Sequence, residues 1–406
     1  MDHEKLETTV EVVRAAPRTA VEYYLRATGS IGSDPSQPSS VPGKGGLCRL
    51  LNDPKFQALL RSALRDKAFF SQPPEEIFDL QGNLLFRDFV FALEPGRELR
   101  VRTGANRALG VLIVSVSLGE PLNRAQLIEA ALAAASSAGA GQPIEPRRVV
   151  CYGYPRLGIL LSAKRGGLAV VDLLDHQICP LQDATSDDGG MWQPLESQPS
   201  EAVEAAADRF DAEARALEDM PGPDEPRGRD IDLSEPPPGV PEHKIEVPLI
   251  VQRKQMFCAL ASSQMILQYH GINLAQDEIA QRMGDVEVIA MAGTPPLDQC
   301  KGLNEICESK GLVADIVFEK DVRSDWNQVL PRIVEEINND RPIQHQLKRP
   351  LHVDVIGGFR GVAGSPDFML WIFDPRQPDG DERLDRWNLV ATNTNDLIFL
   401  RPKEQQ

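Results

Sequence analysis

The clearest pattern of hydrophobic and polar positions lies in the C-terminal part of the chain. Just after Cys258, apolar side chains recur three or four positions apart, at Leu260, Ala261, Met265, Ile266 and Tyr269. This spacing predicts a helix that begins at or just after Cys258. Two mostly apolar stretches, 351–359 and 368–373, follow and predict buried strands. His352 lies at the start of the first stretch, and Asp374 directly follows the second.

The first half of the chain alternates between helical and strand-like patterns. Helical spacing is found over 1–28, 54–68 and 123–137. Strand-like patterns are found over 84–92, 108–118, 149–153, 156–163 and 168–174, the last two joined by a hairpin turn over 164–167. We therefore expect a short N-terminal helix with a Gly/Ser/Pro-rich tether over 1–45, followed by an α+β domain over 46–181.

The charge is concentrated in one segment between the two halves. The whole chain has a net charge of -17, and residues 182–246 alone contain 18 acidic and 5 basic residues. This segment is also rich in Pro, Gly and Ser, so we expect an acidic linker with a lone amphipathic helix over 201–218. Residues 247–406 regain a globular composition and are long enough to form one core. The predicted fold class is therefore α+β, with two domains joined by the linker.

Composition also excludes several classes of function. The chain has no block of clustered Lys and Arg, so nucleic acid is a poor candidate partner. It has no run of the roughly 18–20 apolar residues that a membrane helix needs, and its first residues do not resemble a secretion signal. The 6 cysteines form no CxxC pair, which argues against a disulfide framework or a zinc site. We expect a cytoplasmic protein that uses no cofactor or metal.

Cys258, His352 and Asp374 are the candidate catalytic residues. A cysteine at a helix N-terminus has a lowered pKa, because the free N–H groups and the helix dipole favour the thiolate. A thiolate paired with an imidazole is a working nucleophile, and a strand holds the imidazole of His352 rigidly. Asp374, at the end of the neighbouring strand, would fix the tautomer of His352 and stabilise its imidazolium form.

In this order, the residues resemble the papain-like cysteine peptidases, and more narrowly the double-glycine leader peptidases that process bacteriocins, with related effector proteases of plant pathogens. The resemblance covers about 247–400. It rests on Val247-Pro248, Gln252, Cys258-Ala259-Leu260-Ala261-Ser262, Met265, His352, Gly357-Gly358 and Asp374-Pro375. It implies that Gln252 donates its side-chain amide to the oxyanion, alongside the backbone N–H of Cys258. Two positions depart from the family pattern, since Ala259 follows the nucleophile and Leu351 precedes the histidine.

Alternative interpretations accompany several of these residues. Cys258 alone would fit a buried helix cysteine, Asp374 a turn residue, and Gln255 competes with Gln252. Asn393 and Asn395 are the alternatives to Asp374 as the orienting group. Four further residues are assigned structural or peripheral roles: His270 at the helix end, His345 in a surface loop or at the substrate rim, and Cys300 and Cys307 as core thiols.

The resemblance implies a bacterial cysteine peptidase that hydrolyses a peptide bond in a peptide or protein through a thioester on Cys258. Maturation of a ribosomal peptide and activation of a partner protein are both open settings. The alternatives are a transamidase or deamidase that uses the same thioester, and a binding module that keeps the fold without turnover. The N-terminal domain would bind the substrate or a regulator, and the acidic linker would set reach or be cut by the enzyme itself.

Overall fold

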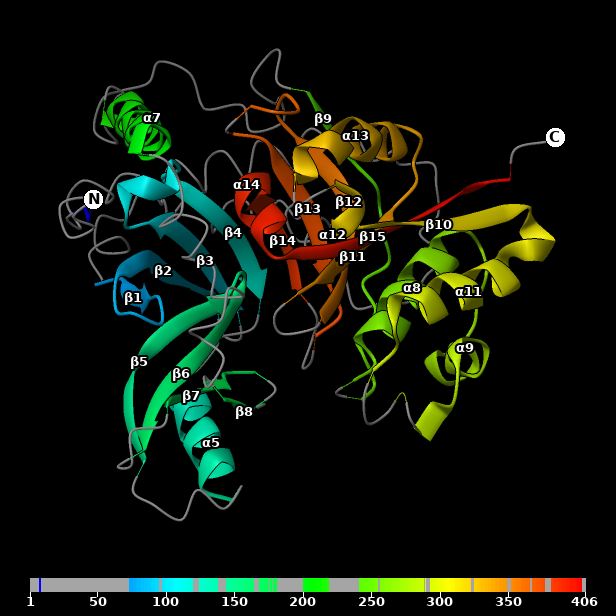
Figure 1. Ribbon diagram of the computed structural model, residues 1–406, viewed down its shortest axis with the longest axis horizontal. Coiled ribbons are helices and arrows are strands. Elements are labelled where there is room, and N and C mark those ends of the chain that lie inside the picture. The colour runs from blue at the N-terminus through cyan, green and yellow to red at the C-terminus, as the bar shows by residue number, and fades with distance from the viewer. Residues whose placement is uncertain are drawn as a thin grey trace. The chain divides into compact units, whose positions relative to one another are not determined.

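The structure is a computed structural model, shown as a ribbon in Figure 1. It describes residues 7–8, 73–94, 97–119, 124–137, 144–163, 168–174, 176, 178–180, 200–218, 241–254, 256–287, 289, 293–322, 325–348, 352–365, 367–376 and 381–403. The chain divides into two compact units, one containing most of the described residues up to 218 and the other those from 241 onward. The predicted helix over 54–68, the tether, the turn over 164–167 and Gln255 lie outside the described residues.

The N-terminal unit is a mixed α+β structure. Its strands are β1 (Glu75–Phe78), β2 (Leu84–Glu94), β3 (Arg97–Gly104), β4 (Ile113–Gly119), β5 (Ile144–Gly153), β6 (Arg156–Ala163), β7 (Leu168–Asp172) and β8 (Ile178–Pro180). Its helices are η3 (Arg107–Leu109), α5 (Arg124–Ser137) and α7 (Ser200–Glu218). The strands pair in the order β4-β3-β2-β1-β5-β6-β7-β8. Ala131 and Ala135 of α5 pack on Ile159 and Val171 of the sheet, which buries the apolar face of the helix.

Three local features of this unit differ from the sequence-based expectation. The strand expected over 108–118 begins only at Ile113, because the side chain of Asn106 caps η3 and Gly110 ends it with a φ of 68°. Strand β3 was not expected, because its arginines resemble an exposed segment. Of the helix expected over 1–28, only Glu7 and Thr8 are described, and Glu7 instead forms an isolated β-bridge with Asn106.

Helix α7 packs against the N-terminal unit and is therefore not the lone helix expected in the linker. Its Phe210 side chain is fully buried, and Val203 and Ala207 form a small cluster with Ala108. At the polar edge of this contact, Asp211 accepts two hydrogen bonds from the guanidinium of Arg107. The buried apolar stripe thus fixes one part of the acidic segment to the folded unit.

The C-terminal unit combines several helices with an antiparallel sheet. Its strands are β9 (Glu242–Lys244), β10 (Leu312–Phe318), β11 (Ile343–Leu347), β12 (His352–Arg360), β13 (Met369–Asp374), β14 (Asp381–Arg386) and β15 (Thr394–Pro402). Its helices are α8 (Cys258–Tyr269), α9 (Gln276–Met283), α11 (Pro296–Cys307), η5 (Glu308–Lys310), α12 (Glu319–Val322), η6 (Trp326–Val329), α13 (Leu330–Asn338) and α14 (Trp387–Thr392). The predicted α+β class is confirmed, with a helix that begins at Cys258 and an antiparallel sheet.

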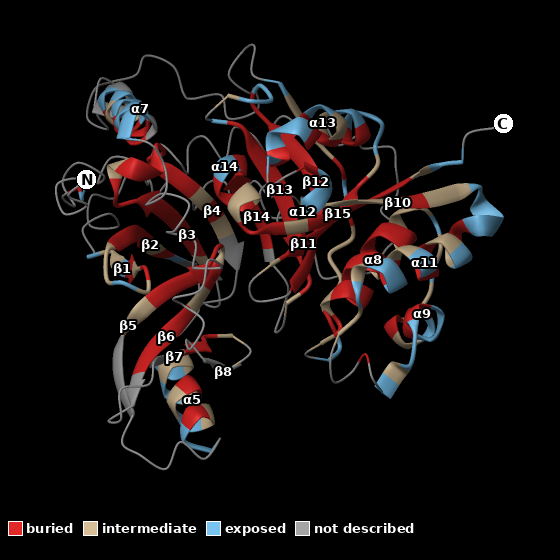
Figure 2. Cartoon of the chain, viewed as in Figure 1, coloured by how far each residue is buried: buried red, intermediate tan, exposed pale blue. Residues whose placement is uncertain are grey.

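The sheet of this unit runs in the order β10-β15-β11-β12-β13-β14, and β9 pairs with β12. Every residue of β11, β12 and β13 is buried, and Figure 2 shows these strands in the colour of buried residues. Helices α8, α9 and α11 group together, apart from α13 (Figure 1). Strand β9 precedes residue 247, where the C-terminal domain was expected to begin. Its Lys244 pairs with Gly358 of β12, so the last residues of the expected linker belong to the sheet. Among the described residues, no helix has both the length and the apolarity needed to span a membrane.

Candidate active site

Cys258 is the first residue of α8, and its thiol is half-buried. Burial alone would raise the pKa of this thiol, but a hydrogen bond with His352 and the positive charge of that ring lower it. Backbone hydrogen bonds from Val353 and Ala259 act in the same direction. The net result is a thiol pKa below its ordinary value, as the position of Cys258 at a helix N-terminus predicts.

His352 is the first residue of β12 and lies between Cys258 and Asp374. Its Nε2 atom is 2.7 Å from Oδ1 of Asp374, which leaves Nδ1 as the ring nitrogen available to the thiol. Burial lowers the pKa of His352, whereas the charge of Asp374 and the hydrogen bonds on both sides raise it, and the net shift is upward. The ring is thus held between a lowered-pKa thiol and a carboxylate.

Asp374 is the last residue of β13 and is buried. Burial would raise the pKa of this carboxyl group, but the charge of Arg376, the charge and hydrogen bond of His352, and the charge of Arg383 hold it well below its ordinary value. The backbone N–H of Arg376 donates to Oδ1 at 3.0 Å, and Nη1 of Arg383 donates to Oδ2 at 3.0 Å. Asp374 therefore stays ionised beside His352.

Polar contacts tie the helix of Cys258 to the strand of His352. The hydroxyl of Ser262, one turn into α8, donates to the backbone oxygen of Val353 at 2.9 Å. The side chain of Gln344 on β11 donates to the backbone oxygen of Ala259 at 3.1 Å and to the hydroxyl of Ser263 at 3.1 Å. All three side chains are fully buried, so these bonds hold α8 in one position on the sheet.

Gln252 lies on the segment that precedes α8 and is anchored to the residue after Asp374. Its backbone N–H donates to the oxygen of Pro375 at 2.7 Å, and its side-chain Nε2 donates to the oxygen of Lys254 at 3.2 Å. Gln276 of α9 holds the segment from the other side, accepting from the N–H of Arg253 at 2.9 Å. The side chain of Gln252 is buried, so its position is fixed.

Residues 244–394 match the model of the Peptidase_C39 like family. This segment contains Cys258, His352 and Asp374 and resembles the cysteine peptidases of that family. A search among curated proteins finds no match to the chain.

Three solved structures each resemble part of this chain. A double-glycine motif protease from an AMS/PCAT transporter, in complex with the leader peptide, has 19% identity and a TM-score of 0.27, covering 39% of this chain and 94% of its own. The peptidase domain of Streptococcus ComA, a bifunctional ABC transporter, has 20% identity and a TM-score of 0.26, covering 38% and 97%. A fragment of Prevotella intermedia prointerpain A has 12% identity and a TM-score of 0.28, covering 63% and 97%.

The remaining polar residues of the peptidase domain fall into different environments. Asn393 and Asn395 lie around the start of β15, where Nδ2 of Asn395 bonds Asp396, and Asp374 is the residue whose carboxylate bonds His352. His270 ends α8 as expected, and burial lowers its pKa. Burial also raises the pKa of the Cys307 thiol to about 11, in agreement with a core thiol.

The expectation for His345 was wrong. This residue is fully buried on β11 instead of lying in a surface loop. Its Nδ1 is 2.7 Å from Oδ1 of Asp354, and its Nε2 is 3.0 Å from the hydroxyl of Thr394. A short polar sequence such as Gln344-His345-Gln346 resembles a loop, but pairing with β12 and β15 places it inside the sheet.

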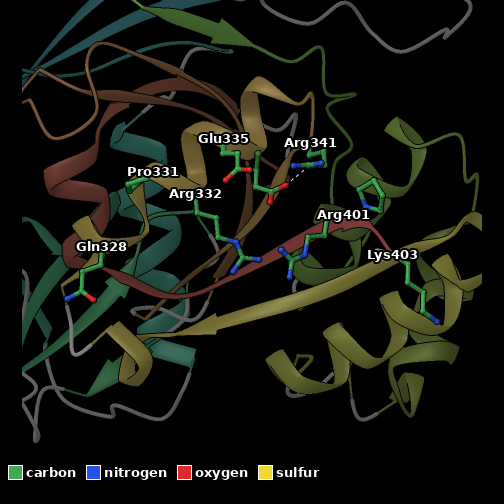
Figure 3. Close-up of a pocket in the computed structure, with 9 residues that line it drawn as sticks. Gln328, Pro331, Arg332, Glu335, Arg341, Arg401 and Lys403 are labelled. Carbon is green, nitrogen blue, oxygen red and sulfur yellow. Dashed lines mark hydrogen bonds and ion pairs between the residues drawn. The ribbon is translucent and has the colours of Figure 1, made fainter. Parts of the chain in front are cut away.

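A hollow in the C-terminal unit, with a volume of about 640 Å³, contains none of these site residues (Figure 3). Its charged lining consists of Arg332, Arg341, Arg401, Lys403, Glu335 and Glu336. All three of its arginines pair with carboxylates, Arg341 with Glu336, and Arg332 and Arg401 with Asp315 at 2.8 and 3.4 Å. Among the described residues, no group of His, Cys, Asp and Glu side chains is arranged to hold a metal ion.

Proposed function

We propose that Cys258 is the nucleophile of a peptidase that cleaves a peptide bond in a peptide or protein. Its thiolate attacks the carbonyl carbon, and the protonated His352 then gives its proton to the departing amine. The C–N bond breaks and an acyl thioester forms on Cys258. A water molecule attacks the thioester while His352 takes a proton from that water. The C–S bond breaks, which releases the carboxylic acid and restores the thiolate and the protonated His352.

In this proposal Asp374 orients His352, and Gln252 stabilises the oxyanion together with the backbone N–H of Cys258. A carboxylate at 2.7 Å from Nε2 favours the tautomer that carries its proton on Nε2, which leaves Nδ1 to accept the proton of the thiol. The anchoring of Gln252 to Pro375 supports its role, because an oxyanion donor has to be held in place before the reaction. The single observation that carries the proposal is the hydrogen-bonded sequence Cys258–His352–Asp374 at the start of a helix.

A transamidase or deamidase is the second candidate, because an amine can capture the same thioester in place of water. Incubation of the protein with a candidate peptide and a free amine separates the two functions. Hydrolysis gives a product with a free carboxyl end, whereas transfer gives an amide whose mass differs from that acid by the amine minus one water. A binding module without turnover would leave the peptide intact.

The test is mass spectrometry of peptides after incubation with the full chain. Peptides with a Gly-Gly junction are the first probes, because the family resemblance points to double-glycine leaders. We expect new peptide ends with the unaltered protein and none with Cys258→Ala or His352→Ala, because members of a catalytic triad act as a unit. Cleavage by a folded Cys258→Ala protein at the rate of the unaltered one would overturn the proposal.

The other parts of the chain receive roles within the same proposal. The N-terminal unit binds the substrate or a regulator, and the acidic segment over 182–246 sets the reach of the peptidase domain or is cut by it. Cys151, Cys258, Cys300 and Cys307 are free thiols, which fits a cytoplasmic setting. The mass spectra of the incubated protein itself report cleavage between 182 and 246 directly.

A further inference from the structure

Arg383 lies at the centre of a buried charge network behind Asp374. It comes from β14, and only 7% of its side chain is exposed. Its guanidinium reaches three carboxylates: Nη1 is 3.0 Å from Asp374, Nη2 is 3.1 Å from Asp354, and Nε is 2.7 Å from Asp385. The side chains of all three aspartates are 0–1% exposed.

The network continues on the far side of Asp354. Oδ1 of Asp354 is 2.7 Å from Nδ1 of His345, and Nε2 of His345 is 3.0 Å from the hydroxyl of Thr394. That hydroxyl donates to the backbone oxygen of Val390 at 3.0 Å. Arg383 is therefore aimed by Asp354 and Asp385, and Asp354 is held in turn by His345.

The two oxygens of Asp374 have separate contacts. Oδ1 faces His352 and the N–H of Arg376, whereas Oδ2 accepts from Arg383 and lies 3.5 Å from Nη2 of Arg376. Rotation of the carboxylate would break the bond to His352 and the bond to Arg383 together. Only Nη1 of Arg383 bonds Asp374, but Asp354 and Asp385 hold the other nitrogens of the same planar guanidinium and so fix the direction of that bond. A single ammonium group has no such plane to be fixed.

We propose that Arg383 is a positioning residue that holds the Asp374 carboxylate in the rotation that orients His352, and that Asp354 and Asp385 aim it. This inference rests on the proposed function. Arg383 does not touch the substrate in this proposal. It acts on the reacting sulfur only through Asp374 and His352.

Any effect of pH on His352 also depends on the titratable and charged groups that surround it. They are Cys258 from α8, Asp354 from β12, Asp374 and Arg376 at the end of β13, Arg383 and Asp385 from β14, His345 from β11, and the exposed Arg253 and Lys254 of the segment bound to Pro375. Among them, Arg383 bridges Asp374 to Asp354 through two nitrogens of one guanidinium.

Positioning and simple charge predict opposite results when Arg383 is changed. If Arg383 acts only as a nearby cation, Arg383→Lys keeps the charge and leaves the thiol unchanged. If the fork positions Asp374, the same substitution weakens the support of the His352 imidazolium. The thiolate of Cys258 then forms at higher pH.

The experiment measures the rate at which iodoacetamide alkylates Cys258 in the full chain as a function of pH, with peptide mass spectrometry to identify the site. For Arg383→Lys we expect the midpoint to rise by about one pH unit, which lowers the thiolate fraction below the midpoint about tenfold. Arg360→Lys is the matched control, because Arg360 is also fully buried, lies on β12 and pairs with Glu242 at 3.5 Å. Its midpoint should equal that of the unaltered protein.

Asp354→Asn is the second variant. If thermal unfolding shows that Arg383→Lys is not folded, the test of the inference rests on Asp354→Asn alone. It keeps Arg383 and Asp374 but removes the charge that aims Nη2, so the midpoint should rise by a smaller amount. A midpoint unchanged in the folded variants would overturn the inference and leave the proposed function intact. An unaltered protein whose Cys258 reacts no faster at neutral pH than Cys300 or Cys307 would instead overturn the proposed function.

Discussion

Replacing His352 with alanine removes the group that lowers the pKa of the Cys258 thiol. In the unaltered protein this pKa lies below its ordinary value of 9.0, because the hydrogen bond and charge of His352, together with two backbone hydrogen bonds, outweigh the effect of burial. In His352→Ala the effect of burial is no longer offset by this ring. The thiol should then ionise at a higher pH than in the unaltered protein.

The size of the shift follows from the interaction that is lost. A hydrogen bond to a charged group contributes about 1.5–3 kcal/mol. One pKa unit corresponds to about 1.4 kcal/mol at room temperature. The midpoint of the alkylation profile of Cys258 should therefore rise by about 1–2 pH units. At pH values below both midpoints, the alkylation rate should fall by about 10- to 100-fold.

The assay is alkylation by iodoacetamide over a range of pH, resolved by peptide mass spectrometry. Cys300 and Cys307 are internal controls, since burial raises both of their pKa values and neither contacts His352. His270→Ala is the matched control variant, because His270 lies at the opposite end of the same helix. An unchanged midpoint in His352→Ala, with the protein still folded, would refute the assignment of the thiol–imidazole pair.

Four further substitutions test other parts of the account. Ser262→Ala removes a buried hydrogen bond to Val353 and should lower the free energy of unfolding in urea by about 0.5–1.5 kcal/mol. Gln252→Ala should lower the rate of peptide cleavage by about 10²–10³, and no loss of rate would remove it from the oxyanion site. Burial raises the pKa of Asp396 from 3.8 to about 6. Its contribution to stability is therefore present below pH 3.8 and is lost as the pH rises through about 6. Asp396→Asn should raise the melting temperature at pH 7 but not below pH 3.8. Phe210→Ala should destabilise the N-terminal unit by about 3–5 kcal/mol, and a change below about 1 kcal/mol would show that α7 does not pack there in solution.

The sequence predicts the core of the site because each of its residues sits at the end of a strongly patterned element. Cys258 opens a helix with regular apolar spacing, and His352 and Asp374 begin and end apolar strands. Patterns of this kind survive in the folded protein because apolar burial dominates its energy. The contact between His352 and Asp374 then follows from neighbouring strands in one sheet.

The sequence does not predict the network of Arg383, Asp354 and Asp385 behind Asp374, for a physical reason. Strand β14 reads Asp-Glu-Arg-Leu-Asp-Arg over 381–386, a sequence typical of an exposed segment. It lies inside the fold because its charges pair with opposite charges on β12 and β13, as Arg383 does with Asp354 and Asp374. Strand β3 in the N-terminal unit was missed in the same way, since its Arg102 is buried against Asp88. Such pairing depends on residues far apart in sequence.

The acyl-enzyme itself gives the most direct test of the central claim. A turnover mixture of the full chain and a cleaved peptide is quenched in acid, and the intact mass of the protein is measured. The account predicts an adduct equal to the N-terminal product minus water, bound to Cys258 and absent in Cys258→Ala. Peptide cleavage that continues in folded Cys258→Ala, or an acyl adduct on a different residue, would contradict it.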